Sequence, residues 1–230
     1  MRTGLDVDLS GSTLFATLRA ACAEAWGAYV SHPFVRELAD GSLPEPCFRR
    51  YLEQDYLFLI HFARAYGLAV YKSDSVEDLR QASAGLSAIV DRELSLHVSY
   101  CRQWGVDERA LADAPEFGAT IAYTRYVLER GLAGDILDLQ VALAPCIVGY
   151  AEIGQRVAES ARPDAPNPYR EWIEMYASAD YQAVAAAHVS HMDRLMERRG
   201  GPGRLPSLIT TFDQATRLES AFWDMGLAAG

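Results

Sequence analysis

The sequence predicts an all-α fold, a compact bundle of long helices, from three observations. Apolar residues recur at alternating spacings of four and three along most of the 230-residue chain, the period of an amphipathic helix. No stretch alternates polar and apolar residues for long enough to form a strand. Glycine, proline and capping residues separate the apolar stretches, as they do at helix ends. We therefore expect helices at residues 13–30, 45–72, 76–104, 115–130, 135–161, 169–177, 179–198 and 206–227.

The segments between the expected helices support these helix limits. Residues 40–44 (DGSLP) form a turn that leads into the second helix, and residues 73–75 (SDS) cap the third. Residues 162–168 contain three prolines and cannot continue a helix. Residues 200–203 (GGPG) form a turn, but the lysine of a phosphate-binding loop is missing. Pro145 lies inside the 135–161 helix and predicts a kink there.

The composition narrows the class of protein. No linker divides the chain, so we expect one domain over residues 1–230, with residues 1–11 as a flexible N-terminus. The net charge of −10 and the lack of a dense Lys/Arg cluster argue against nucleic-acid binding. The N-terminus carries no signal pattern, and the apolar runs are too short to span a bilayer, so we expect a cytoplasmic protein without membrane contact. The four cysteines form no C-x-x-C pair, which disfavours disulfides and structural zinc.

Three of the expected helices each carry one reactive side chain on an otherwise apolar stripe. These side chains are Asp55, Cys146 and Glu219. A charged group on such a stripe costs several kcal/mol, roughly, unless it is paired, hydrogen-bonded or protonated. Two carboxylates and a thiol on three long helices therefore predict one convergent polar site inside the bundle.

Each of these side chains has a structural and a chemical interpretation. Cys146 is either a small buried apolar residue or a nucleophile. Asp55 is either half of an ion pair, with Arg49, Arg64 or another arginine, or an acceptor for a ligand N–H group. Glu219 either caps a helix or bonds a tyrosine, or it is a general acid in a desolvated setting. The many aromatic side chains suit a flat heteroaromatic ligand.

One Glu–His pair and one His–His pair leave a metal site as an alternative. Glu93 and His97 are one turn apart, and His188 and His191 form an H-x-x-H on another helix. Bundle di-iron sites use carboxylate and histidine pairs, but their usual signature is Glu-x-x-His with further glutamates. Because the spacing here is one residue longer, a buried Glu93–His97 hydrogen bond is the preferred interpretation, and we predict no metal.

Six segments, in this order along the chain, resemble the TenA family, also called thiaminase II or aminopyrimidine aminohydrolase. The segments are 31–35 (SHPFV), 40–44 (DGSLP), 48–56 (FRRYLEQDY), 143–146 (LAPC) with Tyr150, 169–173 (YREWI) with Tyr176, and 219–223 (ESAFW). The resemblance runs from about residue 12 to the end. With Cys146 present, the chain is similar to the cysteine-containing branch of the family.

The resemblance implies a heme-oxygenase-like fold, a homotetramer and an enzyme without metal or organic cofactor. It implies hydrolysis of 4-amino-5-aminomethyl-2-methylpyrimidine to the 5-hydroxymethyl product and ammonia, in salvage of the thiamin pyrimidine, with thiamin as a second substrate. It also implies the roles of individual residues. Cys146 matches the nucleophile and Glu219 the acid/base, while the substrate-binding positions are Asp55, Phe58, Tyr123, Tyr150, Tyr176 and Phe222.

Some alternatives stay open at this point. Phe58 stands where relatives often carry tyrosine, which bears on substrate preference. Tyr126 lies one turn from Tyr123 and competes with it for the pocket position. The rival functions are a non-enzymatic regulatory protein and a metal- or heme-dependent oxidase on the same fold.

Overall fold

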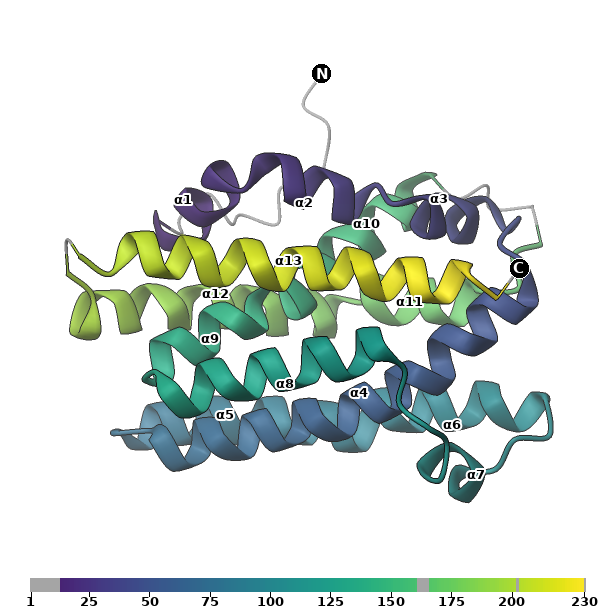
Figure 1. The fold of residues 1–230 in the computed structure, drawn as a ribbon, viewed down its shortest axis with the longest axis horizontal. Coiled ribbons are helices and arrows are strands. Elements are labelled where there is room, and N and C mark those ends of the chain that lie inside the picture. Colours follow the sequence, from purple (N-terminus) through teal and green to yellow (C-terminus); the bar gives the residue numbers. More distant parts are fainter. Residues whose placement is uncertain (1–12, 161–165, 202, 230) are drawn as a thin grey trace. The chain divides into compact units, whose positions relative to one another are not determined.

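The computed structural model describes residues 13–160, 166–201 and 203–229, and Figure 1 traces them along the chain. Every regular element in these ranges is helical, which confirms the predicted all-α class. In chain order they are α1 (Thr13–Ala21), α2 (Ala23–Val30), α3 (Pro33–Asp40), α4 (Glu45–Lys72), α5 (Val76–Ala88), η2 (Ile89–Glu93), α6 (Leu94–Gln103), α7 (Glu108–Ala112), α8 (Gly118–Ala133), α9 (Ile136–Ala144), η3 (Pro145–Gly149), α10 (Tyr150–Ser160), α11 (Arg170–Ala177), α12 (Ala179–Arg199) and α13 (Leu205–Leu227).

The structure divides three of the expected helices. The first breaks at Cys22 into α1 and α2, and the third and fifth each contain one π-helical turn, η2 and η3. The proline at position 145 opens η3, so the predicted local disruption takes the form of a widened turn. Residues 1–11, the end of the fifth helix at residue 161 and most of the proline-rich segment lie outside the described residues.

Two short helices, α3 and α7, were not predicted. Helix α3 begins where the ring of His32 accepts a hydrogen bond from the backbone N–H of Phe34, and Pro33 occupies the first turn. It ends at Gly41, whose φ of +79° is the left-handed conformation that favours glycine. Helix α7 begins at a conventional Asp107 cap, with the carboxylate accepting from the N–H of Ala110.

Contacts along the chain gather into two compact units. The first comprises the described parts of Met1–Leu43 and Gln140–Ser220, and the second those of Pro44–Leu139 and Ala221–Gly230. Helices α9 and α13 each contribute residues to both units. The single domain expected over residues 1–230 stays a prediction.

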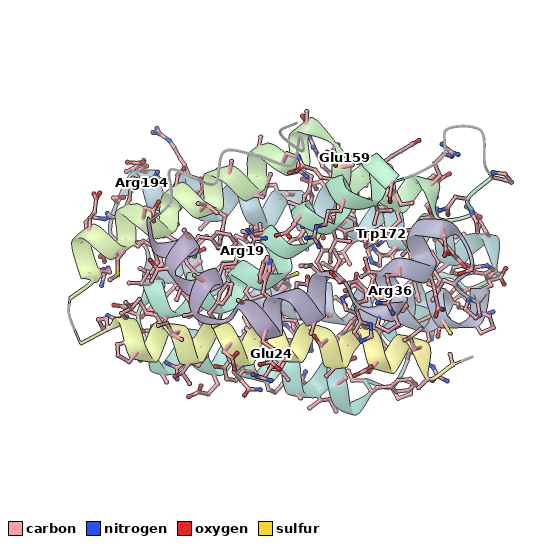
Figure 2. All side chains as sticks on the ribbon, turned by 90° about the horizontal axis from the view of Figure 1, so that it is seen from above. Arg19, Glu24, Arg36, Glu159, Trp172 and Arg194 are labelled. Carbon is pink, nitrogen blue, oxygen red and sulfur yellow. The ribbon has the colours of Figure 1, made fainter. Side chains whose placement is uncertain are left out.

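In the first unit, large aromatic side chains and close helix contacts form the core. The rings of Trp26 and Phe212 stack with centroids 5.4 Å apart, and Phe15 meets Phe212 edge-on. Helix α10 packs closely on α11, and α1 packs on α12, where Asp193 accepts from the N–H of Leu14. Figure 2 shows Trp172 inside this packing, and the side chain is fully buried.

In the second unit, α4 is the central element. Figure 1 shows α8 running alongside α4, and α5, α6 and α7 also contact it. Gly85 on α5 allows one close approach, because a Cβ there would overlap the ring of Tyr66. Buried side chains therefore occur all along α4, and Asp55 is among them.

One continuous helical stretch has the length and composition to cross a membrane. It is Ile136–Ser160, and 94% of its most apolar window is buried inside the protein. The prediction that no apolar stretch is long enough was therefore wrong on length. A stretch that is buried to this extent inside the protein is typical of a core helix.

Candidate active site

The three reactive side chains on apolar stripes are all buried. Asp55 is 4% exposed, Cys146 8% and Glu219 2%, which confirms that each stripe faces protein. Asp55 belongs to the second unit, whereas Cys146 and Glu219 belong to the first. Each group is therefore described within its own unit, and the convergence of the three stays a prediction.

Asp55 makes two short hydrogen bonds, both through Oδ2. The hydroxyl of Tyr51, one turn earlier on α4, donates to it at 3.0 Å, and Nε2 of His97 lies 2.6 Å away. Oδ1 accepts no hydrogen bond from the residues that the structure describes. Asp55 thus has a histidine partner from α6, and neither Arg49 nor Arg64 pairs with it; Arg49 pairs with Glu53.

The protonation of His97 follows from its other nitrogen. Nδ1 lies 2.7 Å from the main-chain carbonyl of Glu93, and a carbonyl only accepts, so Nδ1 carries a proton. Complete burial favours the neutral ring, but the hydrogen bond and charge of Asp55 outweigh it, and the pKa of His97 is raised above its usual value. The expected Glu93–His97 hydrogen bond exists, but it uses the main chain of Glu93.

Aromatic rings surround this part of α4. The Phe58 ring lies 4.9 Å from that of Tyr123 on α8 and 5.7 Å from that of Phe222 on α13, measured between centroids. Tyr51 meets Phe222 edge-on at 6.1 Å. The Phe58 ring is therefore close to two other residues expected to line a pocket, Tyr123 and Phe222. Tyr123 is the buried tyrosine of its pair, because Tyr126 is only half-buried.

Gln54, next to Asp55, fixes the beginning of α8. Its side-chain oxygen accepts from the N–H of Phe117 at 2.8 Å and from the hydroxyl of Thr120 at 2.6 Å. Its amide donates to the carbonyl of Pro115 at 3.0 Å. One buried amide thus satisfies three polar groups at the N-terminus of the helix that carries Tyr123.

Cys146 occupies the second position of the π-helical turn η3. The turn packs against Tyr29 of α2, whose hydroxyl donates to the carbonyl of Pro145 at 3.2 Å. Gly149 makes the contact possible, since a Cβ there would lie 2.6 Å from the Tyr29 hydroxyl. Such turns are frequent at functional sites because they alter the direction of side chains within an otherwise regular helix.

Tyr150 and Tyr176 form one aromatic cluster with Trp172 in the first unit. The Tyr150 and Tyr176 rings lie 4.9 Å apart, and Trp172 lies 4.5 Å from Tyr176. Gly154 sets the spacing of α10 and α11, because a Cβ there would lie 2.5 Å from the main chain of Tyr176. The two predicted pocket tyrosines are thus neighbours.

Glu219 and Phe222 lie three residues apart on α13, on the same face of the helix. Both side chains are almost completely buried.

Two of the three histidines of the metal-site alternative, His97 and His188, are engaged elsewhere. Asp55 and the Glu93 carbonyl occupy both ring nitrogens of His97, and Nε2 of His188 bonds the carbonyl of Gln140 at 3.0 Å. Burial, with the nearby charge of His191, lowers the pKa of His188 to about 3. No group of three or more His, Cys, Asp or Glu side chains in the described part of the chain is arranged to hold a metal ion. None of the four cysteines, all described, forms a disulfide.

The sequence patterns did not identify the contacts of four residues that fix the positions of these side chains and helices. Tyr51, Gln54 and Tyr29 were not singled out, and His97 was assigned to Glu93 rather than to Asp55. Tyr51 carried a usable signal, because it lies four residues before Asp55 on one helix face. The other contacts join distant parts of the chain and have no local signature.

Comparison with known proteins gives the family. The model of the TENA/THI-4/PQQC family matches residues 19–229. A protein of Haemophilus influenzae described only as uncharacterised is 39% identical over 88% of this chain and 93% of its own length. An aminopyrimidine aminohydrolase of Halalkalibacterium halodurans is 33% identical over 91% of this chain and 93% of its own length. Such relatives confirm the prediction of a hydrolytic enzyme.

Solved structures confirm the fold. A TenA family transcription regulator from a Silicibacter species superposes with a TM-score of 0.90 and 43% identity, covering 94% of this chain and 97% of that protein. A Shewanella denitrificans domain with a heme oxygenase-like fold superposes with a TM-score of 0.69 over 91% of this chain and 90% of its own, at 15% identity. The fold is thus heme-oxygenase-like, and the chain belongs to the TENA/THI-4/PQQC family.

Proposed function

We propose that this chain is an aminopyrimidine aminohydrolase of the thiaminase II type. Its substrate is 4-amino-5-aminomethyl-2-methylpyrimidine, which it converts to the 5-hydroxymethyl product and ammonia, and thiamin is a second substrate. The observation that carries the proposal is a buried carboxylate, Asp55, with one oxygen committed to Tyr51 and His97 and aromatic rings close by. The relative named for this activity supports the same assignment.

Asp55 binds and orients the substrate in this proposal. Its Oδ1 accepts from N–H groups on the edge of the aminopyrimidine ring, while Phe58, Tyr123 and Phe222 offer flat surfaces to the ring. A buried acceptor is selective, because a ligand without the matching N–H group leaves the carboxylate desolvated and unpaired. Tyr150 and Tyr176, which belong to the first unit, are the further substrate-binding residues of this proposal.

Cys146 supplies the nucleophile. Its thiolate adds to the ring carbon next to the one that bears the aminomethyl group, which breaks the aromaticity of the ring. The electron pair then expels the amine, protonated by Glu219, and leaves an exocyclic methylene. Water adds to this methylene and loses a proton, the ring regains aromaticity, and the thiolate departs. The sum of these steps is one water consumed and one ammonia released.

The test is a product assay with matched variants. Purified protein is incubated with the aminopyrimidine and, separately, with thiamin, and the hydroxymethyl product is followed by chromatography. We expect Cys146→Ala to lose nearly all turnover and Asp55→Asn to raise KM strongly. Cys101→Ala is the matched control, because this second buried cysteine has a thiol whose pKa burial raises to about 12. Product formation by Cys146→Ala at the wild-type rate would contradict the mechanism.

A regulatory role is the rival that a relative's description brings forward, because the Silicibacter protein is called a transcription regulator. The net charge of −10 opposes binding to a phosphate backbone. A mobility-shift assay at physiological salt separates the two functions, and a shifted band together with no product from either substrate would favour regulation.

The metal-dependent oxidase is the second rival. The hydrogen bonds of His97 and His188 argue against it, because both histidines already bond protein groups. Activity that survives dialysis against a chelator would support the hydrolase. We also infer a homotetramer, a cytoplasmic location and a role in thiamin pyrimidine salvage, and the assembly is testable by light scattering.

A further inference from the structure

We propose that His97 is a positioning residue that holds Asp55 as a carboxylate, with Oδ2 committed to the protein and Oδ1 left as the substrate acceptor. The proposal rests on the function proposed above and adds a residue that contacts no substrate. Its basis is the chain of contacts from the Glu93 carbonyl through the His97 ring to Asp55.

The hydrogen bonds of the His97 ring fix the number of protons that it carries. The Glu93 carbonyl fixes one proton on Nδ1, so a second proton is shared between Nε2 and Oδ2 across 2.6 Å. Either the ring is an imidazolium beside a carboxylate, or both groups are neutral. The Tyr51 hydroxyl donates to the same Oδ2 and stabilises negative charge there, while the Glu93 carbonyl stabilises positive charge on the ring. Both contacts favour the ion pair.

Both partners of the His97–Asp55 pair are buried. The side chain of His97 has no exposed surface and that of Asp55 only 5%, so water cannot solvate either charge. The charged groups that face His97 are Asp55 from α4 and Glu93 from the preceding turn, and both favour the cation. Without His97, the charge on Asp55 would be buried with only the Tyr51 hydroxyl as a donor, and breaking a buried pair in this way is costly.

The same hydrogen bonds set the orientation of the Asp55 carboxylate. Two donors, Tyr51 and His97, bond the same oxygen, Oδ2, and restrict rotation of the carboxylate. Histidine ligands of metals depend in the same way on an outer partner, whose loss costs about 10- to 100-fold. We therefore expect His97 to act on substrate binding rather than on the chemical step.

Kinetics with three variants test the role. His97→Gln keeps a donor but loses the charge, so we expect KM to rise about 10-fold and kcat to change by less than about 3-fold. His97→Leu removes the donor as well and should raise KM further. His61→Gln is the control, because this histidine of the same unit pairs with Glu116, 3.1 Å away, and not with Asp55, and it should keep wild-type kinetics.

A spectrum of the protein without substrate tests the charge state. The protein is labelled with ¹⁵N-histidine, and the His97 signal is assigned by its loss in His97→Gln. We expect both His97 nitrogens to be protonated at neutral pH and Asp55→Asn to remove one of those protons. His188 is the reference in the same spectrum, because its pKa lies near 3 and its ring is neutral.

The outcomes separate this proposal from the proposed function. A His97 ring with one protonated nitrogen, or wild-type KM in a folded His97→Gln variant, overturns the positioning role. If the wild-type protein hydrolyses neither the aminopyrimidine nor thiamin, the proposed function is wrong, and so is the role of His97 in substrate binding. The spectrum then still decides whether the buried pair is ionic.

Discussion

The hydroxyl of Tyr29 donates a hydrogen bond to the main-chain carbonyl of Pro145, and the Tyr29 ring lies directly against Gly149. The two contacts hold the first and last residues of the π-helical turn that contains Cys146. A tyrosine from α2 thus fixes the backbone that presents the thiol. This relationship explains why a glycine ends the turn.

Gly149→Ala should destabilise the protein. The new Cβ would lie 2.6 Å from the Tyr29 hydroxyl and even closer to the ring, so Tyr29 must move and its bond to Pro145 must lengthen. We expect a loss of about 1–3 kcal/mol in the free energy of unfolding, measured with urea. The alkylation rate of Cys146 by iodoacetamide should change as well.

Gly27→Ala is the matched control, because this glycine lies in α2, two residues before Tyr29, and nothing lies within 4 Å of its added Cβ. Alanine at this exposed position should stabilise the helix by about 0.5–1 kcal/mol. Equal stability of Gly149→Ala and the wild type would mean that Tyr29 does not fix the turn.

Gln54→Leu should destabilise the second unit and loosen the beginning of α8. The substitution leaves the N–H of Phe117 and the hydroxyl of Thr120 without their buried acceptor, a cost of about 2–4 kcal/mol. Gln54→Glu keeps the acceptor and should lose less. Hydrogen exchange at the Phe117 amide measures the effect directly, and unchanged protection in Gln54→Leu would contradict it.

His188 should make the protein sensitive to acid. The unfolded histidine binds a proton below its ordinary pKa of 6.5, whereas the buried ring stays neutral until about 3. The unfolded state therefore binds more protons in this window, and stability falls as pH decreases from 6.5 towards 3. At pH 4.5 the loss is about 2–3 kcal/mol, at 1.36 kcal/mol per pKa unit.

His188→Gln isolates this contribution, because glutamine does not titrate and its amide is able to donate to the Gln140 carbonyl. Urea unfolding at pH 7 and pH 4.5 should show a smaller drop in the variant than in the wild type. An identical drop in both proteins would mean that other groups govern the acid response.

The sequence pattern was sufficient for the long helices, though not for α3 and α7, and for the buried character of Asp55, Cys146 and Glu219. Both follow from local periodicity, which a single helix already imposes. The partners were not predictable in this way. The bond between Asp55 and His97 joins residues 42 apart in the chain, and that between Tyr29 and Pro145 joins residues 116 apart. Such contacts depend on how helices pack, and helical periodicity gives only the face that is buried.

The two π-helical turns were missed for a related reason. Pro145 gave a signal for η3, because proline removes a backbone donor, but Ile89–Glu93 contains no proline or glycine. Helical periodicity alone does not distinguish a single widened turn from an ordinary one.

Gly154→Ala should be more disruptive than Gly149→Ala, because its added Cβ meets main chain rather than a movable ring. The Cβ would lie 2.5 Å from the carbonyl carbon of Tyr176 and 2.8 Å from the amide nitrogen of Ala177, so α10 and α11 must separate. We expect a loss of about 2–4 kcal/mol in unfolding free energy, at the upper end for overpacking. Separation would also part the Tyr150 and Tyr176 rings, now 4.9 Å apart, and raise KM for the aminopyrimidine. Thermal unfolding and steady-state kinetics measure both effects, with Gly27→Ala as the control. Wild-type melting by Gly154→Ala would show that the two helices tolerate a wider spacing.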